Sequence, residues 1–144
     1  MKTLLVLTCA VALVSLTNGV EAAETTAADF RLAIKNLDDA VAEADLQKVL
    51  ADLAKFVKVD EPLVRKAMVE QKLPFSGVAL AQLLAEKTGK KFAEVLETNP
   101  QRDWPEACAK AQVSLSEAVA RLEDLWAKVS LLTYEQQKKR KKKK

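Results

Sequence analysis

The chain contains no histidine, and this absence excludes more functions than any other feature of its composition. Histidine is the usual general base near neutral pH, a common metal ligand and a member of the hydrolase triads. Cysteine is almost absent too, since Cys108 is the only one outside an apolar N-terminal run that contains Cys9. A single cysteine forms neither an internal disulfide nor a thiolate zinc site. We therefore expect no enzymatic activity, no cofactor and no metal, and assign no catalytic residue.

Glycine and strand-forming patterns are also scarce. The chain has three glycines, Gly19, Gly77 and Gly89, which do not fit either glycine-rich phosphate-binding fingerprint. No stretch alternates β-branched or aromatic residues with polar ones, as a half-buried strand would. Alanine and leucine are abundant instead, and apolar residues make up 49% of the chain. The composition indicates a helical protein.

Apolar residues recur at helical spacing throughout the body of the chain. Phe30, Ile34, Leu37 and Val41 follow steps of four, three and four, which places them on one helix face. The pattern predicts an all-α fold, a compact bundle of six or seven short helices. Helices are expected from about Thr26 to Ala44, after the caps Asp45, Asp60 and Ser76, over about 91–98 and 103–111, and for some 20 residues after Ser114.

The sequence predicts whether several side chains are buried or exposed in this bundle. Leu63 and Trp126 are predicted on buried helix faces, and Cys108 is expected to pack in the core as a small apolar residue. The acidic pairs Asp38-Asp39 and Glu123-Asp124 are expected on solvated surfaces, because adjacent helical residues point about 100° apart. These assignments leave no acidic pair as a candidate for catalysis.

The first 22 residues have the organisation of an export signal. Lys2 precedes an apolar run from Leu4 to Leu16, which Asn18-Gly19 ends, and small or modest residues precede a cleavage point after Ala22. The run is shorter than the ~20 residues that a membrane-spanning helix needs. We expect a signal peptide over 1–22, a helical domain over 23–137, and a periplasmic or secreted protein.

The charge is divided between two parts of the chain. Residues 23–137 hold 15 Lys and Arg against 19 Asp and Glu, a net charge of −4, whereas the last seven residues are all cations. A run of like charges without apolar residues is predicted to be disordered. It is either a solubilising end or a binding site for polyanions, and the predicted polyanion-binding residues are Lys138, Lys139, Arg140, Lys141, Lys142, Lys143 and Lys144.

The expected partners follow from that charge. The cationic run can bind membrane headgroups, lipopolysaccharide phosphates or nucleic acid by charge alone, because it contains no aromatic side chain that stacks on bases. The helical body is a candidate surface for a protein partner, and Cys108 for a disulfide-linked dimer. We expect an exported binding or scaffold protein that its tail tethers to an anionic polymer or membrane. One alternative is an amphipathic carrier of lipids or small ligands.

A second alternative is a helix-turn-helix nucleic-acid-binding protein. Ala85, Gly89 and Val95 have the spacing of that motif, in which a small residue allows close helix packing and a glycine forms the turn. Lys90 and Lys91 would lie near phosphates. The exposed side of the second helix would also present Glu94 and Glu97, which phosphates repel. An ordinary helical hairpin explains the same spacing.

The stretch from Leu73 to Leu115 resembles a helical module of exported bacterial proteins of unassigned function. The likeness rests on the helix end Thr88-Gly89-Lys90 and on the following helix from Phe92 to Leu96. The module has a glycine-rich loop before its tryptophan, whereas "NPQRDW" contains no glycine before Trp104. The resemblance implies a helical fold and export, and it implies no active site.

Overall fold

The structure, a computed structural model, describes residues 24–143 and contains only helices in that range. This confirms the predicted all-α bundle; the signal peptide predicted over 1–22 and Lys144 lie outside the described residues. The described residues form seven α-helices and one π-helical segment: α1 (Ala27–Ala42), α2 (Leu46–Val57), α3 (Glu61–Arg65), η1 (Lys66–Glu70), α4 (Phe75–Thr88), α5 (Phe92–Thr98), α6 (Trp104–Lys110) and α7 (Leu115–Lys141).

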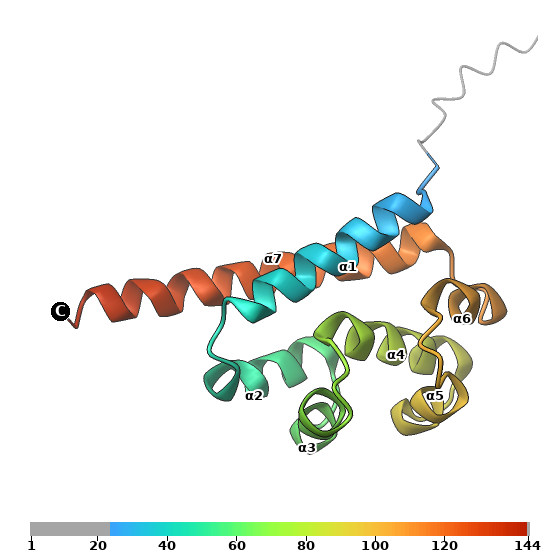
Figure 1. Cartoon of the computed structure of the whole chain (residues 1–144), viewed down its shortest axis with the longest axis horizontal. Coiled ribbons are helices and arrows are strands. Elements are labelled where there is room, and N and C mark those ends of the chain that lie inside the picture. The colour runs from blue at the N-terminus through green and yellow to red at the C-terminus, as the bar shows by residue number, and fades with distance from the viewer. Residues whose placement is uncertain (1–23, 144) are drawn as a thin grey trace, which may run out of the picture.

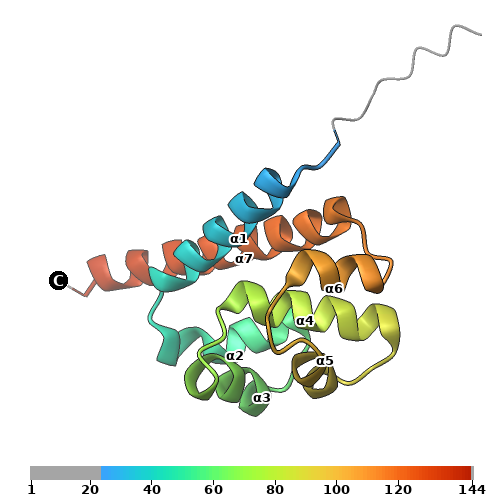
Figure 2. The same ribbon diagram turned by 45° about the vertical axis from the view of Figure 1, so that its right-hand side comes forward.

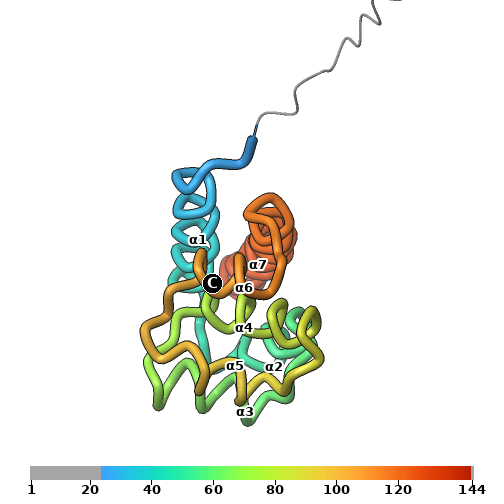
Figure 3. The backbone as a smooth tube through the Cα atoms, turned by 90° about the vertical axis from the view of Figure 1, so that its right-hand side faces the viewer, coloured from blue at the N-terminus to red at the C-terminus, as the bar shows by residue number. Residues whose placement is uncertain are grey.

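The helices form two layers. The two longest, α1 and α7, lie side by side and run in the same direction, while α2 to α6 pack beneath them (Figures 1 and 2). The view along these two helices shows the upper layer as a pair and the shorter helices gathered on one side of it (Figure 3). One long face of the α1–α7 pair therefore faces the core, and the opposite face has no layer above it.

The short helix α4 lies at the centre of the bundle. It contacts α1, α2, η1, α5, α6 and α7, and every residue from Phe75 to Ala81 is buried, followed by Leu83, Leu84 and Ala85. A helix that is apolar on all sides is typical of a core helix rather than of a surface one. The continuous apolar run of this segment thus explains its central position.

Gly77 allows two side chains to pack closely against α4. A Cβ atom added there would lie 2.6 Å from Cδ1 of Leu73 and 3.3 Å from Cζ2 of Trp104. Both side chains belong to the core, with exposed fractions of 4% and 8%. The backbone of Gly77 is helical and requires no positive φ. Glycine is therefore needed here for close packing and not for its backbone freedom.

The start of α4 is tied to α1 through Asp38 and Ser76, and here two predictions were wrong. Ser76 does not cap α4, because Pro74 occupies the N-cap and Ser76 lies inside the first turn. Its backbone N–H donates to Asp38 at 2.9 Å, and its hydroxyl donates to the other carboxylate oxygen at 2.7 Å. Asp38 is partly buried and satisfies a free N–H at the helix start, whereas Asp39 is exposed as predicted.

Most predicted core positions are confirmed, with two exceptions. Leu63 is 41% exposed at the edge of α3, and Trp126 is 46% exposed on α7. The third helix ends at Arg65, where the π-helical segment η1 begins and rotates the later residues relative to a regular α-helix. Trp126 lies at the border of the buried face of α7, next to a shallow groove that Ala33 and Asn36 of α1 also line.

Replacing Asp38 by alanine is expected to lower the free energy of unfolding by about 2 kcal/mol or more. The change leaves the N–H and hydroxyl of the buried Ser76 without a partner. Asp39→Ala is the matched control, since that exposed side chain only pairs with Lys35 one turn earlier. Urea denaturation of both variants measures the difference. Equal stability of the two variants would contradict the role given to Asp38.

The same carboxyl group predicts a pH dependence. Burial raises the pKa of Asp38 above its ordinary value of 3.8, although the hydrogen bonds from Ser76 act in the opposite direction. The folded state therefore binds this proton at a higher pH than the unfolded state. As the pH falls through the raised pKa to below 3.8, the wild type should gain stability relative to Asp38→Asn. Denaturation curves at several pH values test this, and a relative loss of stability would contradict it.

Candidate polyanion-binding site

The predicted binding residues lie at the end of α7, and the structure differs here from the sequence prediction. Residues 138–141 form the last turn of the helix rather than a disordered tail. The helix is already formed by the packed residues that precede this turn, so no new nucleation is needed. Lysine and arginine are good helix formers, and cations at a helix C-terminus interact favourably with its dipole. These effects oppose the mutual repulsion on which the prediction of disorder was based.

The end of α7 projects beyond the rest of the bundle (Figure 1). Thr133 is the last buried residue of the helix, and eight helical residues follow it, which correspond to about 12 Å. Every side chain from Gln137 to Lys143 is exposed. The structure therefore brings six of the seven predicted residues together on one projecting helix end, and the seventh, Lys144, lies outside the described range.

One of the six cations has an acidic neighbour. The guanidinium of Arg140 lies 3.6 Å from the carboxylate of Asp45, which begins α2. Lys48, at 2.8 Å, lowers the pKa of Asp45, and the charge of Arg140 acts in the same direction. The lysines at 138, 139, 141, 142 and 143 form no ion pair with any other residue in the range 24–143. Their charges are free to bind a partner.

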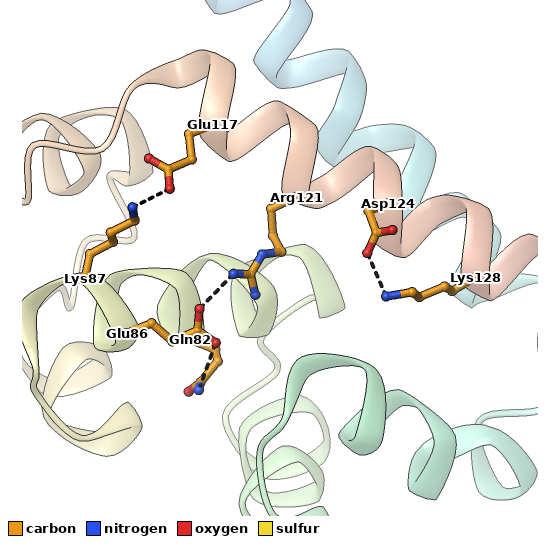
Figure 4. A network of polar contacts seen from close by, with 7 residues as sticks. All are labelled: Gln82, Glu86, Lys87, Glu117, Arg121, Asp124 and Lys128. Carbon is orange, nitrogen blue, oxygen red and sulfur yellow. Dashed lines mark hydrogen bonds and ion pairs between the residues drawn. The ribbon is translucent and has the colours of Figure 1, made fainter.

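Two ion pairs fix the first half of α7 on the central helix α4 (Figure 4). Lys87 lies 2.6 Å from Glu117, and Arg121 lies 2.7 Å from Glu86. Burial alone would raise the pKa of Glu86, but the hydrogen bond and charge of Arg121 outweigh it and lower that pKa. Since both pairs are partly exposed, each stabilises the fold by no more than about 1 kcal/mol. The direction of α7 therefore rests mainly on its apolar packing against α1 and α4, to which the two ion pairs add.

Sequence reasoning missed a set of exposed apolar side chains on the same helix. Trp126, Leu131 and Tyr134 are 46%, 60% and 62% exposed, and they lie in the turns that precede the cations. The signal was present in the sequence, because Leu131 and Tyr134 lie outside the stripe of Leu122, Leu125 and Val129 that faces the core. The cationic end is thus continuous with an apolar surface.

The hairpin of α4 and α5 has the geometry that its sequence predicts. Gly89 ends α4 in the left-handed conformation, with φ of 70°, while Ala85 and Val95 are buried between the helices. The exposed side of α5 carries Glu94 and Glu97, and Glu94 accepts a hydrogen bond from the backbone of the residue that precedes the helix. The two carboxylates would repel the phosphates of a nucleic acid bound to this side. Nucleic-acid binding by this hairpin stays a prediction.

Cys108 lies in the core, as its position after Trp104 predicted. It is 0% exposed, and burial raises the pKa of its thiol to about 11, with a smaller contribution from the charge of Glu117. The thiolate is the reactive form of cysteine, so this thiol is both inaccessible and protonated. A disulfide-linked dimer stays a prediction, and it requires the bundle to open around α6.

A pocket of about 230 Å³ lies between the α4–α5 hairpin and α6. Its wall includes Thr88, Thr98, Asn99 and Asp103, and the side-chain nitrogen of Asn99 is buried without a hydrogen-bond partner among the described residues. The pocket is open to solvent and small for a lipid chain. Transport of a lipid or small ligand therefore stays a prediction.

Residues 24–143 contain no group of three or more acidic or cysteine side chains placed to hold a metal ion, and none of the helices in that range has the length and apolar character of a transmembrane span. No known protein family, no curated protein and no solved structure matches the chain. The resemblance of Leu73 to Leu115 to an exported bacterial module stays a prediction.

The native protein is expected to resist thiol reagents. Because Cys108 is buried and its thiol has a raised pKa, labelling at mildly alkaline pH should be slow and should become complete once denaturant is added. Intact mass after exposure to an alkylating reagent measures the labelled fraction. Rapid labelling of the folded protein would contradict the core position of Cys108.

Proposed function

We propose that this chain is an exported, non-enzymatic helical protein whose body binds or organises a partner and whose cationic end tethers it to an anionic membrane or polymer. One observation carries the proposal. A run of cations projects from the bundle on a rigid helix, while the remainder of the chain is acidic. The N-terminal export pattern of residues 1–22 supports a location where lipid headgroups, lipopolysaccharide phosphates and extracellular nucleic acid are available.

The charge on the helix end is large enough for a useful tether. Each Lys or Arg close to an anionic membrane contributes about 1 kcal/mol at most, so seven contribute several kcal/mol before the losses from screening. A helix that is already formed loses less conformational entropy on binding than a disordered segment of the same charge. The projection of the end also keeps the acidic body away from the anionic surface.

The test replaces all seven residues from Lys138 to Lys144 by glutamine, which removes the charge and keeps a high helix propensity. The protein is recovered after export with its own leader, and its N-terminus is checked by intact mass, for which we expect a chain that begins at Ala23. Binding to anionic vesicles and to immobilised heparin is then measured at increasing salt. The glutamine variant should lose most of its affinity for both, because a charge-driven contact weakens as counterions are added.

A matched variant separates the helix end from the remaining lysines. Lys90→Glu with Lys91→Glu changes the charge at the α4–α5 hairpin and leaves α7 intact. We expect this variant to bind vesicles and heparin as the wild type does. Loss of binding in the hairpin variant, with full binding in the glutamine variant, would contradict the tether and favour the helix-turn-helix alternative.

A further inference from the structure

The exposed apolar residues of α7 and the lysines that follow share one helix face. Ala127, Leu131, Tyr134 and Lys138 follow one another at steps of four, three and four, which places them in one line along the helix. Lys141 and Lys142, three and four residues further on, continue that line. The residues that face the core, Leu122, Leu125 and Val129, occupy the opposite side of the helix.

This line is the outer face of the C-terminal half of α7, and no other described segment covers it. Leu131 and Tyr134 are exposed by 60% and 62%, and Trp126 borders the line on the side of α1 with 46% of its surface exposed. The view in Figure 3 shows no helix above the α1–α7 pair. A helix that buries one side in a bundle normally has a polar opposite side, so this exposed apolar surface requires an explanation.

Acidic residues also lie around this face: exposed Asp124 stands three residues before Ala127, and Glu43 of α1 lines a shallow hollow together with Tyr134. Glu123 lies one turn before Ala127, and Glu135 lies beside Leu131, towards the side of the helix away from α1. Between Ala127 and Lys143, Glu135 is the one acidic residue of the chain. The face thus changes along the helix from an apolar part with two aromatic rings to a part with a high density of positive charge.

We propose that this face is a binding surface for an anionic phospholipid bilayer, with α7 lying along the surface of the membrane. Trp126, Leu131 and Tyr134 enter the boundary between headgroups and acyl chains, where aromatic and apolar side chains of interfacial helices lie. The lysines after Tyr134 contact the headgroup phosphates. The inference rests on the proposed function and deepens it, because it selects a membrane among the anionic partners and adds an apolar contact to the electrostatic one.

The side chains favour a bilayer over a polymer of phosphates. A nucleic acid or polysaccharide satisfies the lysines by charge, but it offers no apolar medium for Leu131 and Trp126. In a bilayer all three exposed apolar side chains leave water, and each transfer stabilises the bound state. The combination of aromatic rings and a cationic end on one helix is therefore typical of an anionic membrane surface.

The experiment compares two pairs of substitutions at exposed apolar positions. Leu131→Ser with Tyr134→Ser changes the proposed face, and Leu63→Ser with Val69→Ser is the matched control, since Leu63 and Val69 are each 41% exposed on α3 and η1. The exported protein is titrated with phosphatidylglycerol vesicles, with phosphatidylcholine vesicles, with heparin and with duplex DNA. Trp126 serves as a reporter through its quenching by acrylamide, while Trp104, 8% exposed, contributes a constant background.

If the face binds lipid, the change at positions 131 and 134 weakens binding to phosphatidylglycerol vesicles by about tenfold or more and leaves binding to heparin unchanged. Vesicles should also protect Trp126 from acrylamide, whereas heparin should not. The control pair at positions 63 and 69 should bind as the wild type does. Part of the affinity for vesicles should persist at high salt, because burial of apolar surface is not screened.

Two results would overturn the inference in different ways. If the serine pair at 131 and 134 binds vesicles as the wild type does and Trp126 stays accessible, while the glutamine variant of residues 138–144 loses binding, the membrane contact is refuted and the electrostatic tether stands. Tighter binding to DNA than to vesicles, again with Trp126 accessible, would have the same meaning. If the glutamine variant retains full binding, the proposed function fails, and the inference fails with it.

Discussion

The burial of the first half of α4 on all sides, from Phe75 to Ala81, is the constraint on which the rest of this structure depends. A helical segment without a polar face cannot lie at a surface, and α1, α2, η1, α5, α6 and α7 all contact α4. Its small residues, Gly77 above all, allow Leu73 and Trp104 to approach closely. The N–H groups at its first turn need partners inside the protein, and Asp38 of α1 supplies one of them. The contacts of α4 thus determine both the packing of the core and the position of α1.

The position of α7 also depends on its contacts with α4. Its buried residues pack towards α4 and α1, and the ion pairs of Glu117 and Arg121 with α4 fix its first half. The helix is about 40 Å long for its 27 residues, longer than the bundle that it covers. Its last turns therefore extend past the core, and its outer face remains uncovered. The exposed apolar residues and the cations occupy these two places, so the candidate site results from a mismatch between the length of the helix and the size of the bundle.

The fold was predictable where periodicity decides the structure and less so where turns and neighbours do. The apolar steps from Phe30 to Val41 identified the first helix and its buried face correctly. The chain has few glycines, and four of its turns instead place residues in the left-handed conformation with positive φ, namely Lys58, Lys72, Arg102 and Gln112. No propensity favours lysine or arginine there, so tertiary packing must hold these turns. Such positions are not visible in the sequence.

The candidate site was predictable in its charge and not in its geometry. The run from Lys138 to Lys144 identified the cations, but whether they form a helix depends on the packed residues upstream of them. The role of Asp38 was missed for the same reason, since its partner Ser76 is 38 residues away in the sequence. The exposed positions of Leu131 and Tyr134 required knowledge of which side of α7 faces the core. Charge is a local property of the chain, whereas exposure is a property of the assembled bundle.

In the proposed binding mode, the separation of charge along α7 would give the molecule a preferred orientation at an anionic surface. The acidic body carries a net charge of −4 over residues 23–137, and the cations begin one turn beyond the last buried residue of α7. The screening length at physiological salt is about 8 Å, so an acidic side chain farther than this from the helix end does little to neutralise it. In the proposed binding mode, an anionic membrane attracts the cationic face of α7 and repels the acidic body on its far side. Because α7 is a continuous helix packed on α1 and α4, the proposed membrane contact would orient the whole bundle, with the side opposite the α1–α7 layer facing away from the membrane.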